Sequence, residues 1–115
     1  HMEPLTIFHN PKCSKSRQTL EIIQQAGVSP KIVKYLEDTP DATFLEHALA
    51  VLGADVMLRK GEEVYKNHIK GKDLTHTELA QLMVEHPKLI ERPLVVKGDD
   101  MVMGRPPENV RALLD

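Results

Sequence analysis

The chain has 115 residues, of which 41% are hydrophobic and 28% are charged, and its formal net charge is −2. This length and balance indicate one soluble globular domain over 1–115 and exclude a disordered chain, while the slightly acidic total argues against nucleic acid as a partner. No apolar run approaches the roughly 20 residues of a membrane-spanning helix and no signal peptide is recognisable, so we expect a cytoplasmic protein without membrane contact. His1 is interpreted as a cloning scar ahead of a native start at Met2.

The first third of the chain predicts a β-α-β unit. Residues 5–8 alternate in hydrophobicity, as in a short strand, and a turn follows at 10–11. Apolar side chains at helical spacing predict a helix over 14–26, which Gly27 would end. A second apolar run predicts a strand over 31–35.

The middle of the chain predicts helices without strands. Helical spacing returns over 40–52, and either Thr39 or Asp41 could cap the start of this helix. Residues 54–73 are polar and interrupted by glycines, which predicts short helical turns and a loop. Together with the helix that comes next, residues of about 40–90 are expected to form a helical insert.

The last third predicts a helix, a β-hairpin and a terminal helix. Thr75 and Glu78 have the spacing of a capping box ahead of a helix that ends at His86-Pro87. A turn at 98–100 between two apolar runs predicts the hairpin, and the final helix follows 106–107. The order β-α-β, helical insert, β-β-α is that of an α/β fold of thioredoxin-like type, with a small mixed sheet covered by helices.

Cys13 is the only cysteine, and it lies where the first strand ends and the first helix begins. A single thiol excludes a disulfide framework and a zinc site built on several thiolates. The free N–H groups at a helix start and the helix dipole stabilise a thiolate and can bind an oxyanion beside it. A lone cysteine is more often a small buried hydrophobe. Its neighbours Lys12, Lys15 and Arg17 favour a reactive thiolate instead, with a lowered pKa.

The spacing around Cys13 removes several kinds of chemistry. Cys13 and Arg17 form C-x-x-x-R, so the phosphatase loop C-x-x-x-x-x-R is absent. Cys13 and Ser16 form C-x-x-S, so any disulfide of this thiol must be with another molecule. His9 stands four residues before the cysteine, where it could hold or protonate the thiol or, equally, be a strand-end histidine bonded to backbone. No nucleotide-binding or metal-binding motif occurs.

Three arginines have suggestive neighbours at expected loop or strand ends, namely Arg59, Arg92 and Arg105. A guanidinium group binds a tetrahedral oxyanion through two parallel hydrogen bonds and stays charged. The three could converge on one anion, or each could be a solvated surface charge, and spacing does not decide between these. The bond between Arg92 and Pro93 precedes a strand and is a candidate cis bond.

These residues together resemble the glutaredoxin-coupled arsenate reductase family, which has a thioredoxin-like fold. The matching segments, in order along nearly the whole chain, are His9-Asn10-Pro11-x-Cys13-x-x-Ser16-Arg17, Tyr35-Leu36-Glu37, Leu58-Arg59-Lys60, His86-Pro87, Arg92-Pro93-Leu94-Val95-Val96 and Gly104-Arg105-Pro106. The resemblance implies that Cys13 is the nucleophile and that His9 assists the thiolate. It also implies an oxyanion site made by Arg59, Arg92 and Arg105, a cis bond at Pro93, and supporting roles for Asn10, Ser16 and Arg17.

By the same resemblance, the expected reaction is reduction of arsenate to arsenite through a thiol–arsenate adduct on Cys13. Glutathione would be a co-substrate and glutaredoxin a partner, with no bound cofactor and no metal, in arsenic detoxification. The chain departs from familiar members in having Ser14-Lys15 after the cysteine and in ending soon after Arg105. Two alternatives remain. One is a monothiol oxidoreductase that acts on another substrate, and the other is an Spx-like regulator that binds RNA polymerase, although Ser16 replaces the second cysteine of that group.

Overall fold

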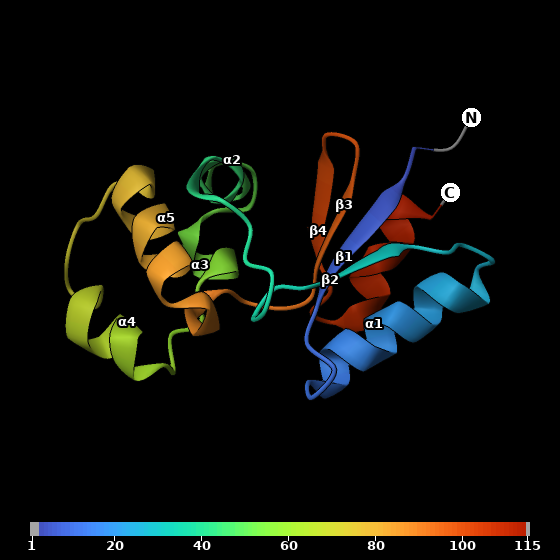
Figure 1. The fold of residues 1–115 in the computed structure, drawn as a ribbon, viewed down its shortest axis with the longest axis horizontal. Helices are drawn as coiled ribbons and strands as arrows, with labels where there is room; N and C mark the ends of the chain where they lie inside the picture. Colours follow the sequence, from blue (N-terminus) through green and yellow to red (C-terminus); the bar gives the residue numbers. More distant parts are fainter. Residues whose placement is uncertain (1–2, 115) are drawn as a thin grey trace. The chain divides into compact units, whose positions relative to one another are not determined.

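A four-stranded mixed sheet holds the two ends of the chain together (Figure 1). Its strands are β1 (Leu5–His9), β2 (Lys31–Lys34), β3 (Leu94–Lys97) and β4 (Asp100–Met103), in the order β2-β1-β3-β4. β1 pairs in parallel with β2, whereas the other neighbours are antiparallel. A parallel pair needs a crossover, which the first helix supplies, and an antiparallel pair needs only a tight turn. The predicted mixed sheet is therefore confirmed.

The computed structural model describes residues 3–114, so His1 and Met2, the expected scar and start, lie outside the described residues. The chain separates into two compact units. One comprises His1–Asp38 with Arg92–Asp115 and contains the sheet, and the other is Thr39–Glu91, close to the expected helical insert. Within 3–114, no helix is both long and apolar enough to cross a membrane.

Two helices pack against each other on one side of the sheet, α1 (Ser14–Gln25) and the 3-10 helix η2 (Pro107–Leu113) (Figure 1). Alternate residues of β1 are buried, as the strand pattern predicts. The core beneath the helices is made by Leu5, Ile7, Ile23, Val95, Val110 and Leu113. Gly27 follows α1 with a φ of +82°, a conformation that favours glycine over any residue with a Cβ. This packing fixes the start of α1 at the end of β1.

The unit Thr39–Glu91 contains five helical segments, and one isolated antiparallel bridge joins Leu58 to Ile90. The segments are α2 (Ala42–Leu52), α3 (Ala54–Met57), α4 (Glu63–His68), α5 (His76–Glu85) and the 3-10 turn η1 (Pro87–Leu89). The side chain of Asp41 accepts the N–H of Phe44 at 2.9 Å, so Asp41, and not Thr39, caps α2. The predicted capping box is present, with Thr75 and Glu78 each bonded to the backbone of the other. Local capping chemistry thus sets where both longer helices begin.

Candidate active site

The loop from β1 to α1 is held by its own hydrogen bonds. The side-chain oxygen of Asn10 accepts the N–H of Lys12 at 3.0 Å, and its carbonyl accepts the N–H of Cys13 at 3.0 Å. Cys13 is the N-cap residue of α1, with extended backbone angles, and its carbonyl accepts the N–H of Arg17. The guanidinium of Arg17 donates to the Pro11 carbonyl at 2.8 Å. The cysteine therefore sits on a braced turn at the positive end of a helix.

His9 is linked to this loop through Ser16. The two side chains are buried, and His9 Nδ1 lies 2.6 Å from Ser16 Oγ, which also accepts the N–H of Asn10 at 3.0 Å. Burial lowers the pKa of His9, and the charges of Lys34 and Arg17 lower it further. The ring therefore favours its neutral form at pH 7, and its hydrogen bond to Ser16 links the end of β1 to the first turn of α1.

The pKa of Cys13 is lowered, although the residue is only 8% exposed. Burial acts to raise this pKa, but it is outweighed by the backbone N–H of Ser16, the hydrogen bond and charge of Arg92, and the backbone N–H of Lys15. The sequence suggested that the charges of Lys12, Lys15 and Arg17 would do this. That expectation is wrong in its detail, because the cation comes from Arg92, while Lys15 contributes its N–H and Arg17 is turned to the Pro11 carbonyl. The two interpretations of a lone cysteine, a buried residue and a thiol with a lowered pKa, therefore both apply to Cys13.

Arg92 and Arg105 meet beside the thiol because of the register of the hairpin. Leu94 pairs with Met103 in the β3–β4 ladder, so the residues just outside the ladder on each strand also lie opposite one another. Nη1 of Arg105 lies 3.2 Å from the Arg92 carbonyl and 3.9 Å from Cys13 Sγ. Two of the three predicted anion ligands are thus brought to the cysteine.

A close approach of backbone to helix fixes the position of Arg105. A Cβ built on Gly104 would lie 2.5 Å from Thr19 Oγ1 and 2.8 Å from Cγ of Pro93, so no larger residue fits there without movement. The N–H of Gly104 donates to the Pro93 carbonyl at 2.8 Å. The Arg92–Pro93 bond is cis, as the resemblance implied, and so is the bond between Arg105 and Pro106.

Arg59 belongs to the other unit, Thr39–Glu91. Its Nη1 lies 3.2 Å from Glu62 Oε2, and its Nε lies 3.8 Å from Glu91 Oε1. Its N–H donates to the Leu89 carbonyl at 2.9 Å, which fixes its backbone beside η1. Its role as a third anion ligand stays a prediction.

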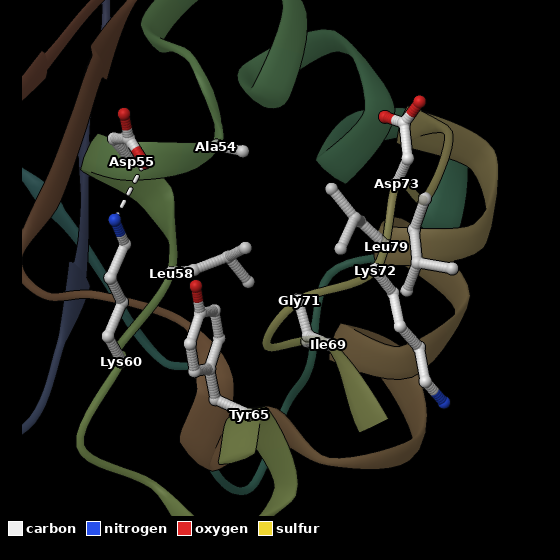
Figure 2. Close-up of a pocket in the computed structure, with 11 residues that line it drawn as sticks. Ala54, Asp55, Leu58, Lys60, Tyr65, Ile69, Gly71, Lys72, Asp73 and Leu79 are labelled. Carbon is white, nitrogen blue, oxygen red and sulfur yellow. Dashed lines mark hydrogen bonds and ion pairs between the residues drawn. The ribbon is translucent and has the colours of Figure 1, made fainter. Parts of the chain in front are cut away.

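A hollow of about 240 Å³ lies within the helical unit (Figure 2). The ring of Tyr65 and the side chain of Leu58 line it, and at its rim Nζ of Lys60 is paired with Asp55 at 2.7 Å. None of the predicted site residues is among the described residues that line it. This hollow therefore carries none of the site residues that the sequence predicts.

The ArsC family matches residues 8–113 of the chain, which is nearly all of it. The chain belongs to the ArsC family. An arsenate reductase from Haemophilus influenzae is 41% identical over 94% of this chain and 97% of its own length. YfgD from Escherichia coli K12, named as an uncharacterized protein, is 44% identical over 90% of this chain and 91% of its own. The solved arsenate reductase structure from Vibrio cholerae has a TM-score of 0.89 at 42% identity and covers 98% of this chain and 99% of that one.

These similarities confirm the ArsC-type, thioredoxin-like α/β fold that the element order predicts. Two site features escaped the sequence reasoning. Thr19 is fully buried and packs against Gly104, but a threonine inside a helix gives no signal of such a contact. Lys34 acts on His9 across the sheet, and this follows only from the register that pairs these two residues. In the described part of the chain, no group of three or more His, Cys, Asp or Glu side chains is arranged to hold a metal ion.

Proposed function

We propose that this ArsC-family chain is an arsenate reductase in which Cys13 is the nucleophile. The observation that carries the proposal is the thiol itself, held at the start of α1 with a lowered pKa and with Arg92 and Arg105 beside it. A thiolate next to two guanidinium groups suits attack on a small tetrahedral oxyanion. Relatives of similar length that are named arsenate reductases support the choice of arsenate.

Arsenate would bind between the first N–H groups of α1 and the guanidinium groups of Arg92 and Arg105. The thiolate of Cys13 then attacks arsenic and forms an S–As bond. One As–O bond breaks, and its oxygen, protonated by arsenate and solvent, leaves as water, so that a thiol–arsenate adduct remains. The guanidinium groups neutralise the charge that otherwise repels an anionic nucleophile from an anionic substrate. Arg59 is proposed as a third ligand on the strength of the Leu58-Arg59-Lys60 motif.

The electrons come from outside the chain, because Ser16 stands where a second cysteine would be. We propose that glutathione attacks the adduct and that glutaredoxin completes the cycle. In total, one arsenate and two glutathione molecules give one arsenite, one glutathione disulfide and one water, so the two electrons that reduce As(V) to As(III) are those lost by the two thiols. The reaction needs no bound cofactor and no metal. It does need a reducing compartment, so we propose the cytoplasm.

The experiment is a coupled assay of NADPH consumption with glutathione, glutathione reductase, glutaredoxin and arsenate. We expect turnover by the unaltered protein, none by Cys13→Ser with its fold intact, and little with thioredoxin in place of the glutathione system. Ser14→Ala, which changes an exposed residue next to the nucleophile, is the matched control and should stay active.

One competing function has an observation in its favour. A single activated thiol without a resolving partner also suits a monothiol oxidoreductase that removes glutathione from proteins. Processing of a glutathionylated protein without any arsenate turnover would replace the proposed reaction by this one. Capture of RNA polymerase without either activity would indicate the regulator.

A further inference from the structure

A cavity of about 310 Å³ adjoins the cysteine loop within the sheet-containing unit. It is lined by His9, Asn10, Pro11, Lys12, Lys34, Leu36 and Glu37, and it is called the Lys34 pocket below. His9 pairs with Lys34 in the parallel ladder, so the pocket lies where both parallel strands end, which is where open α/β sheets commonly bind ligands. Lys12 directly precedes Cys13. The pocket is therefore next to the nucleophile but separate from the two arginines.

The lining of the Lys34 pocket combines three charges with an apolar wall. Lys12, Lys34 and Glu37 are exposed, and none of them takes part in the ion pairs found among the described residues. The N–H of Glu37 donates to the Lys34 carbonyl at 2.9 Å, so a tight turn sets the spacing of these two charges. Leu36 is 44% exposed and supplies the apolar wall of the pocket.

We propose that the Lys34 pocket binds glutathione, with its carboxylates on Lys12 and Lys34 and its ammonium group on Glu37. Glutathione carries two carboxylates and one ammonium at neutral pH, which are the opposite charges in the same numbers. A volume near 310 Å³ is at the small end of the range for small-molecule sites and suits a tripeptide. Binding there leaves the oxyanion side of Cys13 free. This inference rests on the proposed function, since it names where that reaction's thiol co-substrate binds.

The first test is direct binding of glutathione to the Cys13→Ser protein, followed by nuclear magnetic resonance. Amide shifts should be confined to residues 9–12 and 34–37. Lys34→Ala should weaken binding about 2- to 5-fold, the range for an ion contact at an exposed lysine. Lys31→Ala is the matched control, because Lys31 is an exposed lysine on the same strand that does not line the pocket. Shifts centred elsewhere, or equal affinities of the two lysine variants, would overturn the proposal.

The second test uses kinetics to separate this pocket from the arsenate site. Glu37→Gln, which changes a pocket residue that acts on neither Cys13 nor His9, should raise the KM for glutathione about 2- to 5-fold and leave the KM for arsenate unchanged. Formation of the arsenate adduct by Glu37→Gln in the absence of glutathione, followed by mass spectrometry, should proceed at the unaltered rate. Equal effects on the two KM values would contradict the assignment.

Modified forms of glutathione test which lysine binds which carboxylate, and whether the pocket binds free or protein-bound glutathione. The glycine ethyl ester of glutathione lacks one carboxylate, so it should bind less tightly than glutathione to the Cys13→Ser protein. Replacing the lysine that binds this carboxylate should weaken the binding of glutathione but should not weaken the binding of the ester any further. A glutathionylated peptide that competes with free glutathione would show that the pocket also takes the tripeptide when it is attached to a protein. If the unaltered protein fails to reduce arsenate, the proposed function fails, whereas the binding experiment still decides the pocket by itself.

Discussion

Replacing Ser16 with alanine tests whether one buried hydroxyl holds the cysteine loop in place. Ser16 is fully buried, and its Oγ is bonded both to His9 Nδ1 and to the N–H of Asn10. Alanine is at least as good a helix former as serine, so α1 itself should survive the change. What is lost is the junction between the end of β1 and the first turn of α1.

The size of the effect follows from the groups left without a partner. His9 Nδ1 is buried, and an unsatisfied buried polar group costs about 1–3 kcal/mol. The N–H of Asn10 is half-buried and can bond to water, which adds about 0.5–1 kcal/mol. The helix propensity of alanine returns about 0.5 kcal/mol. We expect Ser16→Ala to lower the free energy of unfolding by about 1–3.5 kcal/mol.

Urea unfolding followed by circular dichroism measures this loss, and the rate of Cys13 alkylation against pH measures its consequence. Because the N–H of Ser16 lowers the pKa of Cys13, loosening this turn should move the half-maximal rate toward higher pH. Ser14→Ala, at an exposed position in the same turn, should change neither quantity appreciably. If Ser16→Ala behaves like Ser14→Ala in both assays, the hydroxyl does not organise the loop.

Three further predictions concern other parts of the chain. Arg105→Ala should lower the kcat/KM for arsenate about 10- to 150-fold, because it removes a charge-assisted contact worth about 1.5–3 kcal/mol. Arg105→Lys should recover part of this loss, and Arg111→Ala should stay near the unaltered value. An equal loss in Arg111→Ala would show an unspecific effect of charge. Burial lowers the pKa of His9, so below pH 6.5 the unfolded chain binds a proton on this histidine more readily than the folded chain does. The free energy of unfolding should therefore fall as pH falls, and His9→Asn should reduce this dependence on pH. An unchanged dependence on pH in His9→Asn would refute the buried neutral ring. Thr75→Ala removes the capping box of α5 and should cost about 1 kcal/mol in urea unfolding, whereas no loss would mean that the cap is replaced by water.

Sequence reasoning succeeded where chemistry is local. The capping box at Thr75 needs only residues within one helical turn, and the end of α1 needs only the glycine that follows it, so both could be predicted. The sequence did not decide between Thr39 and Asp41 as the N-cap of α2, because threonine and aspartate have similar capping chemistry. Only the backbone conformation selects Asp41, whose side chain faces the N–H of Phe44.

The electrostatics of Cys13 could not be predicted from its neighbours in the chain. Lys12 and Lys15 lie within two residues of Cys13 in the sequence, but both are exposed. The cation that acts on the thiol is Arg92, which reaches it because antiparallel pairing brings the start of β3 to the end of β1. Such long-range placement depends on strand register, and register is a property of the whole sheet. The family resemblance did identify Arg92 as a site residue, because members of one family share the same strand register.

The two outer strands of the sheet are both only four residues long, and this has a consequence for association between molecules. An outer strand offers unpaired backbone groups to which a strand of another chain can add, and Ile32, 44% exposed on β2, would favour such stacking. β2 begins and ends with the exposed charges of Lys31 and Lys34, which oppose the approach of a second copy. If Lys34 also binds a co-substrate, one side chain serves both catalysis and resistance to aggregation. Neutralising both lysines at once should then produce protein that self-associates as its concentration rises.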